Sequence, residues 1–227
     1  MFPLPVTSRA PIPRRHGFRR PGRPARVGRR FVEARRRDPY YRAAQREGLR
    51  SRAAFKLAYV ADRFPILAPG TRVLDLGAAP GGWSIVARER VGPRGAVVAV
   101  DPRAIEPIEG VERVHGRAGD PTLLARLGER PFDTVLSDMS PRISGAYATD
   151  HARSVELVEI ALAVAARLLR PGGTFVAKVF DGDLLPELLQ TMTPRFERVV
   201  RTKPPASREH SAELYVLGFG HRPPPPV

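Results

Sequence analysis

The sequence predicts an α/β fold, with a seven-stranded, mostly parallel sheet covered by helices on both faces. Short apolar strands alternate with helical segments through most of the chain, an order typical of parallel sheets. The strands are continuous apolar runs, which indicates that the sheet is buried on both faces. The last two strands have no helix between them, so we expect one antiparallel strand near an edge of the sheet.

The elements follow in order along the chain. A helical pattern at 38–64 is broken near Gly48 and begins again near Ser51; the buried strand "TRVLDLG" (71–77) and a helix at 81–91 come next. Two more strands, "GAVVAVD" (95–101) and "VERVHG" (111–116), precede a helix at 121–129. The strand "FDTVLSDM" (132–139) is followed by the longest amphipathic helix, at 150–169, which ends at "RPGG" because Pro and Gly break helices. The strand "TFVAKVF" (174–180), a helix at 184–192 and the strands 196–204 and 213–220 complete the pattern.

Composition divides the chain into three segments. Residues 1–37 are rich in Arg and Pro, contain one acidic residue, Glu33, and lack apolar periodicity. We expect them to form a disordered basic arm. Residues 38–220 hold the predicted domain, and residues 221–227 form a proline-rich tail.

Charge and cysteine content limit the functional classes. The 227 residues carry a net charge of +15 and no cysteine. The excess of basic residues points to a polyanionic partner, with nucleic acid favoured over a membrane surface. The absence of cysteine excludes disulfides, cysteine-bound zinc and iron–sulfur clusters, and suits a cytoplasmic location. The sequence has no long apolar segment that would span a membrane and no signal peptide.

The turn after the first strand, "DLGAAPGGWS" (75–84), predicts a nucleoside ligand. Its glycines allow a ligand to approach the backbone, but the spacing is neither G-x-G-x-x-G nor that of a P-loop. Asp75 would repel a pyrophosphate and suits a cationic ligand such as S-adenosylmethionine, which carries an amino group and a sulfonium. Asp101 ends the second strand, where an acid can bind ribose hydroxyls. The alternative is that both acids cap helices or loops.

The lysines form a second signal. Only Lys56, Lys178 and Lys203 are lysine, against 35 arginines, and Lys178 lies inside the buried strand "TFVAKVF". Asp138 ends the preceding strand and points into the same crevice, and Glu213 opens the last strand. Taken singly, Lys56 reads as a solvated helix residue and Glu213 as a capping or paired acid.

Five segments together resemble the FtsJ-like RNA ribose 2′-O-methyltransferases. They are "GLRSRAAFKL", "VLDLGAAPGGWS", "SDMSP", "GGTFVAKVF" and "SREHSAELYVLG", and the resemblance covers about residues 38–220. It implies a Rossmann-like methyltransferase fold, S-adenosylmethionine as cofactor, and ribosomal RNA or the large ribosomal subunit as partner. It also implies a catalytic tetrad of Lys56, Asp138, Lys178 and Glu213. The cofactor contacts that we expect are Asp75, Gly77, Pro80, Gly81, Gly82, Trp83, Asp101, Arg117 and Asp138.

The chemistry of the tetrad explains why arginine does not replace these lysines. A ribose hydroxyl is a poor nucleophile unless its proton is removed or strongly hydrogen-bonded. Arginine does not lose its proton in proteins, whereas a lysine can when burial and a neighbouring cation favour the neutral amine. We therefore expect Lys178 to be the base or the main orienting group, with Lys56 as the nearby cation. No metal is expected, since the five histidines lack ligand spacing.

Some features leave alternatives open. The family has Gly-Asp after the third strand to hold the adenine, whereas this chain has Arg117, with Asp120 three residues on. Lys203, with Arg201 and Arg208, contacts RNA or is simply solvated, and Tyr40 and Tyr41 stack on bases or pack against the sheet.

Three other functions compete with ribosomal RNA methylation. They are methylation of a tRNA anticodon loop, a noncatalytic RNA-binding or ribosome-assembly role, and a dinucleotide oxidoreductase. The intact tetrad disfavours the second, and the turn spacing with Asp75 disfavours the third. We expect the enzyme to be a monomer.

Overall fold

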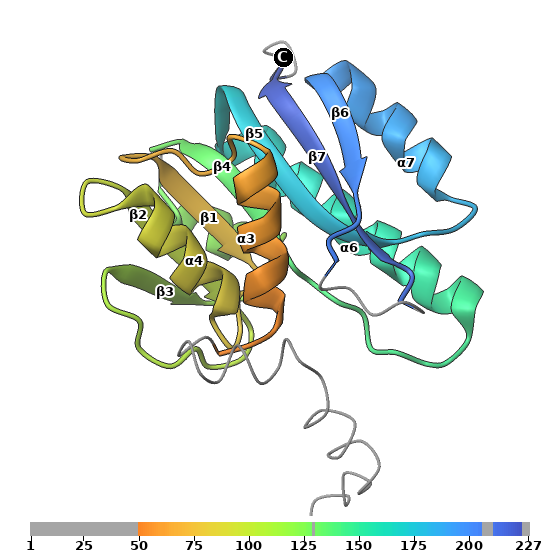
Figure 1. Cartoon of the computed structure of the whole chain (residues 1–227), viewed down its shortest axis with the longest axis horizontal. Coiled ribbons are helices and arrows are strands. Elements are labelled where there is room, and N and C mark those ends of the chain that lie inside the picture. The colour runs from red at the N-terminus through yellow and green to blue at the C-terminus, as the bar shows by residue number, and fades with distance from the viewer. Residues whose placement is uncertain (1–49, 129, 206–210, 224–227) are drawn as a thin grey trace, which may run out of the picture.

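A computed structural model describes residues 50–128, 130–205 and 211–223. Seven strands form one sheet in the order β3-β2-β1-β4-β5-β7-β6 (Figure 1). The expected basic arm, Tyr40, Tyr41 and Arg208 lie outside the described residues. The strands are β1 (Arg72–Leu76), β2 (Ala96–Asp101), β3 (Val111–His115), β4 (Phe132–Ser137), β5 (Leu169–Phe180), β6 (Phe196–Thr202) and β7 (Glu213–His221).

The sheet is parallel except for β7. Strands β1 to β5 pair in parallel, and β7 pairs antiparallel with both β5 and β6. Because β7 lies second from the edge, the single antiparallel strand near one edge is confirmed. An antiparallel return from β6 to β7 needs no crossover helix, and only residues 203–212 separate the two strands.

Helices cover both faces of the sheet, as expected. One buried cluster joins the sheet to α3 (Ala53–Arg63) and α4 (Gly82–Val91). A second joins its other face to α5 (Pro121–Arg126), α6 (Tyr147–Leu168) and α7 (Leu185–Met192). Figure 1 shows α3 and α4 together in front of β1 and β2. The carboxyl ends of the parallel strands are left at one edge of this three-layer structure, where ligands bind in such folds.

Several boundaries differ from the sequence expectation; for example, α6 begins at Tyr147 and β6 ends at Thr202. The "RPGG" segment ends α6 but belongs to β5, because Leu169 is buried and pairs with Phe132 of β4. The helix expected at 121–129 ends at Arg126, since Gly128 adopts a φ of 77°, a left-handed conformation that terminates helices.

Candidate active site

Strand pairing places the predicted catalytic residues of β5 and β7 on one face of the sheet. Lys178 pairs with Tyr215, and Phe180 pairs with Glu213. Side chains of directly paired residues, and of residues two apart along a strand, share a face. The same face packs against α3, which carries Lys56. The last strand therefore brings Glu213 to both lysines.

The four predicted tetrad residues form two ion pairs. The Lys56 ammonium binds the Glu213 carboxylate. The Lys178 ammonium lies 3.1 Å from Oδ1 of Asp138 and also donates to the Asp138 carbonyl oxygen at 3.0 Å. Both lysine side chains are buried, with exposed fractions of 4% and 7%. The structure thus brings together four residues that are spread from position 56 to position 213.

Both lysines affect the pKa of the Glu213 carboxyl group. Burial alone would raise its pKa, but attraction to Lys56, the hydrogen bond from Lys56 and attraction to Lys178 together lower the pKa below the ordinary value. Glu213 therefore stays ionised at neutral pH and balances positive charge from both lysines.

Tyr215 is a further member of this cluster that the sequence analysis missed. Its hydroxyl donates to Oδ1 of Asp138 at 3.4 Å, and its ring lies 5.4 Å from the ring of Trp83. Burial raises the pKa of Tyr215 well above its ordinary value, and the negative charges of Asp138 and Glu213 raise it further. The phenol therefore keeps its proton and remains a hydrogen-bond donor. Its place two residues after Glu213 was the signal that could have found it.

A cavity of about 640 Å³ lies at the carboxyl ends of β1, β2 and β4 and reaches Lys178 and Asp138. This volume is in the range of small-molecule sites. Four of the expected cofactor residues line it: Gly77, Asp101, Arg117 and Asp138. The wall combines carboxylates with apolar side chains from α6, namely Leu157 and Ile160. A ligand with a cationic end and a flat heterocycle fits this mixture.

Gly77 makes the close approach of the first turn possible. Its φ is 74°, and a Cβ built there would lie 2.7 Å from Cγ of Met139 and 3.0 Å from the backbone of the same residue. The first turn and the segment after β4 therefore meet at a residue without a side chain. The carboxylates and apolar side chains that line the cavity fit S-adenosylmethionine.

Gly77→Ala is expected to weaken S-adenosylmethionine binding by about tenfold or more. The added methyl strains a positive-φ backbone by roughly 1 to 2 kcal/mol and displaces Met139. Calorimetric titration measures the effect. Gly70→Ala is the matched control, because Gly70 has a φ of 84° but no atom within 4 Å of the point where a Cβ would lie. Equal cofactor affinities of the two variants would contradict the assignment.

Asp101 lines the cavity but already has several partners. Oδ2 accepts from the backbone nitrogen of Ala79 at 3.0 Å, and Oδ1 accepts from the backbone nitrogen of Arg103 at 2.8 Å. The Arg103 guanidinium forms an ion pair with the same carboxylate and reaches the Ala79 carbonyl oxygen at 3.0 Å. Asp101 thus ties the first turn to the second strand. Arg103, which the sequence analysis did not single out, lies at the cavity wall.

Arg117 and Asp120 lie after β3, where the sequence differs from the family pattern. Arg117 is exposed and lines the cavity. Asp120 caps α5 instead, because its Oδ1 accepts from the Thr122 backbone nitrogen at 2.9 Å and from the Thr122 hydroxyl at 2.8 Å. The carboxylate of Asp120 is therefore used locally and is not among the residues that line the cavity.

Five expected cofactor residues are not among the residues that line the cavity. Trp83 donates from Nε1 to the Ala53 carbonyl oxygen at 2.8 Å. Asp75 is fully buried, and its Oδ2 accepts from the Ser84 hydroxyl at 2.6 Å. The other carboxylate oxygen of Asp75 has no hydrogen-bond partner. The five residues are Asp75, Pro80, Gly81, Gly82 and Trp83.

Asp75 is expected to make stability depend on pH. Burial raises its pKa to about 7, and the nearby negative charges of Asp138 and Asp101 add to this while the Ser84 hydrogen bond opposes it. The folded state therefore holds the proton more tightly than the unfolded state, so stability from this group is lost as pH rises through about 7. The Asp75→Asn side chain cannot ionise. The melting temperature of this variant, relative to that of the wild type, should therefore rise between pH 5 and pH 8. Calorimetry at several pH values measures this, and a constant difference would contradict it.

Within the described residues, no three His, Asp or Glu side chains gather in a way that could hold a metal ion. None of the helices in that part of the chain is long and apolar enough to cross a membrane.

The sheet order, the antiparallel β7 and the cavity beside the first turn define an S-adenosylmethionine-dependent methyltransferase. The model of the FtsJ-like methyltransferase family matches residues 49–221, and the chain belongs to that family. The predictions of the family, the fold and the cofactor are thereby confirmed.

Named relatives and solved structures agree with this assignment. The chain is 48% identical over 186 residues to the ribosomal RNA large subunit methyltransferase E of Methanothrix thermoacetophila, covering 80% of this chain and 72% of the relative. It is 50% identical to the protein of the same name from Syntrophobacter fumaroxidans, with 81% and 95% covered. A Plasmodium falciparum candidate ribosomal RNA methyltransferase superposes with a TM-score of 0.68 at 27% identity, covering 76% and 100%. Aeropyrum pernix fibrillarin, solved with S-adenosylmethionine, shares the fold at a TM-score of 0.54 and 18% identity, covering 73% and 76%.

Proposed function

We propose that the chain transfers a methyl group from S-adenosylmethionine to a ribose 2′-hydroxyl of RNA, in a uridine of large-subunit ribosomal RNA. One observation carries the proposal: a buried lysine, Lys178, is held by Asp138 at the wall of the cofactor cavity. A hydroxyl acceptor needs a proton acceptor or a strong orienting group at this place. An amine acceptor would instead favour the Asn/Asp-Pro-Pro-aromatic pattern, whereas this chain has "DMSP" after β4.

The tetrad residues divide the work of the transfer. Bound S-adenosylmethionine supplies the methyl group and leaves as the neutral thioether. Lys178 would act on the 2′-hydroxyl, either as the base that takes its proton or as the main group that orients it, while the oxygen takes up the methyl group. Asp138 fixes the position of the Lys178 side-chain nitrogen, while Lys56 supplies a neighbouring positive charge. Glu213 holds Lys56, and in-line positioning contributes much of the rate.

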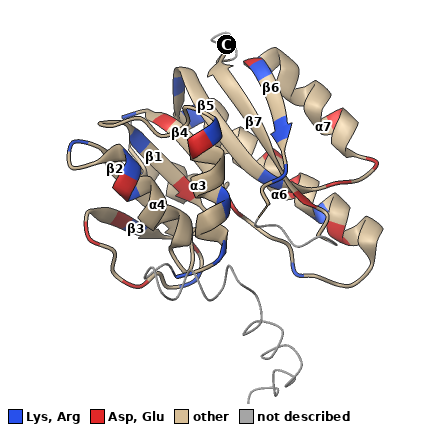
Figure 2. Cartoon of the chain, viewed as in Figure 1, with Lys and Arg blue, Asp and Glu red and all other residues tan. Residues whose placement is uncertain are grey.

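The choice of ribosomal RNA rests on the named relatives and on charge. The relatives are named for methylation of large-subunit ribosomal RNA. Residues 1–49 contain 14 of the 38 basic residues but only three of the 23 acidic ones. In the described part of the chain, acidic residues lie among the basic ones along the helices and strands (Figure 2). The segment before α3 therefore supplies most of the excess charge for phosphate binding.

Labelled methyl transfer tests the choice of substrate. The full chain is incubated with labelled S-adenosylmethionine and three RNA samples from cells that lack the enzyme: free large-subunit RNA, assembled large subunits and tRNA. Label on large-subunit RNA, free or assembled, is the expected result. Label on tRNA alone would overturn the ribosomal assignment while leaving the tetrad chemistry intact. All four tetrad residues come from one chain, so a monomer suffices, and a ribosomal substrate fits the cytoplasmic location expected from the sequence.

A further inference from the structure

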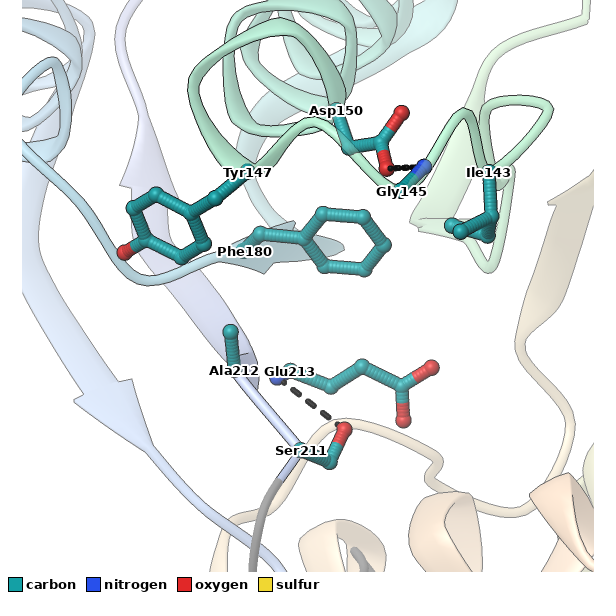
Figure 3. Close-up of a pocket in the computed structure, with 8 residues that line it drawn as sticks. All are labelled: Ile143, Gly145, Tyr147, Asp150, Phe180, Ser211, Ala212 and Glu213. Atoms are coloured by element: carbon teal, nitrogen blue, oxygen red, sulfur yellow. Dashed lines mark hydrogen bonds between the residues drawn. The ribbon is translucent and has the colours of Figure 1, made fainter.

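A second cavity, of about 320 Å³, lies beside the tetrad and is separate in its lining from the cofactor cavity. Figure 3 shows Tyr147, Phe180 and Ile143 along one side and Glu213 with its two preceding residues along the other. The cofactor cavity includes Asp138 and Lys178, whereas this one includes Glu213. The tetrad therefore contributes residues to both cavities, and the two cavities have no lining residue in common.

The distance from Lys178 to the second cavity matches the distance between the ribose and the base of a nucleoside. Phe180 follows Lys178 by two residues on β5 and is paired with Glu213 on β7. Two residues along a strand span about 7 Å. A base is attached to the ribose carbon next to the one that carries the 2′-hydroxyl, so it lies only a few bonds from the reacting oxygen. A ribose placed at Lys178 can thus place its base near Phe180 and Glu213.

The lining offers large apolar and aromatic side chains, two of them exposed, beside the carboxylates of Asp150 and Glu213. Tyr147 is 60% exposed and Ile143 is 65% exposed; only Leu184 joins them as an exposed large apolar residue in the described part of the chain. The Tyr147 hydroxyl donates to the Asp181 carbonyl oxygen, and its ring stacks on that of His151 at 6.2 Å between centroids. The tyrosine is therefore held on two sides and still offers surface to a ligand. Flat aromatic surface of this kind stacks on unpaired nucleobases.

The loop that carries Ile143 is fixed before any ligand binds. Asp150 of α6 accepts hydrogen bonds from the Ser144 backbone nitrogen at 2.8 Å, the Ser144 hydroxyl at 2.8 Å and the Gly145 backbone nitrogen at 3.1 Å. These bonds lower the pKa of Asp150, so it is ionised at neutral pH. A wall of the cavity is thereby preorganised, which reduces the entropy lost on binding.

We propose that this second cavity binds the base of the acceptor nucleotide, turned out of the RNA stack, with Tyr147 as the stacking residue and Ile143 and Phe180 as apolar contacts. The inference rests on the proposed function, since it requires an RNA ribose at Lys178. Removing a base from its stack costs a few kcal/mol, and a preformed apolar cavity beside the reaction centre offsets part of that cost. Because an unpaired base costs less to remove from its stack, the enzyme should prefer an unpaired acceptor nucleotide.

Tyr147→Ala is expected to raise KM for large-subunit RNA by about tenfold, from the stacking contribution of one base. The dissociation constant for S-adenosylmethionine should stay unchanged, because Tyr147 is not among the residues lining the cofactor cavity. Tyr147→Phe keeps the ring and should stay close to the wild-type KM. Leu184→Ala is the matched control, because it removes an exposed apolar side chain outside the cavity lining. Melting temperatures confirm that each variant is folded.

A second substrate distinguishes stacking from an indirect effect. In large-subunit RNA with an abasic ribose ligated in at the methylated position, the 2′-hydroxyl is kept and the base is absent. The wild type should lose about tenfold in kcat/KM on this RNA, and Tyr147→Ala should lose nothing further, because both changes remove the same contact. Independent, multiplying losses would overturn the subsite while leaving the proposed function standing. Absence of transfer by the wild type to any RNA would overturn both.

Discussion

Lys178→Arg is expected to reduce methyl transfer by at least about 100-fold while leaving S-adenosylmethionine and RNA binding in place. Arginine keeps the positive charge that pairs with Asp138, but it cannot accept a proton at neutral pH. Its planar guanidinium also differs in shape from the compact ammonium that donates to the Asp138 carbonyl oxygen at 3.0 Å. Single-turnover transfer, with binding measured separately for each ligand, isolates the chemical step.

Lys203→Arg is the matched control for this result. Lys203 is exposed just after β6 and is not among the residues lining either cavity. The two substitutions are chemically identical and differ only in place. Wild-type rates for Lys203→Arg beside a large loss for Lys178→Arg would tie the effect to the site. Substantial activity of Lys178→Arg would exclude Lys178 as an obligatory proton acceptor.

Glu213→Gln is expected to lower the free energy of unfolding by about 3 kcal/mol and to reduce activity as well. The substitution leaves the ammonium of Lys56, which is 4% exposed, without its carboxylate partner. Because the ion pair lowers the pKa of Glu213, its stabilisation is full at neutral pH and is lost as pH falls. Chemical denaturation at pH 7 and at acid pH measures both features.

Replacing the pair together separates stability from catalysis. Lys56→Met with Glu213→Met substitutes apolar side chains of similar size, a change that is often neutral for stability. We expect near wild-type stability with a loss of activity of about tenfold or more. Asp62→Asn is the surface control, since its pair with Arg90 is exposed and should contribute less than about 1 kcal/mol. An active double variant would show that Lys56 and Glu213 only support the fold.

The central strands could be predicted because β1, β2 and β4 are short, mostly apolar runs that the fold buries. The antiparallel β7 followed from the missing helix before it. The tetrad could be predicted from a different signal: positions 56 and 178 are lysine in a chain whose other basic residues are almost all arginine. Spacing along the sequence alone could not join those positions, since the pairing of Phe180 with Glu213 depends on strand register.

Other parts of the site depend on tertiary contacts that leave no local pattern. Asp75 looks like a ligand contact in the sequence, but the fold buries it beneath the turn against Ser84. The second cavity depends on Asp150 fixing the loop before α6, a contact that spans six residues and has no helix or strand periodicity. Tyr147 appeared in the sequence only as an isolated aromatic residue.

The position of the transferred methyl group tests the central claim most directly. Alkali cleaves RNA through the 2′-hydroxyl, so a nucleotide methylated there resists cleavage at its own 3′ phosphate. Ribosomal RNA labelled by the wild-type chain is hydrolysed in alkali, and the labelled product is sized. The ribose assignment predicts label in an alkali-resistant dinucleotide. Label in a mononucleotide would place the methyl group on a base and contradict the role assigned to Lys178 and its partners.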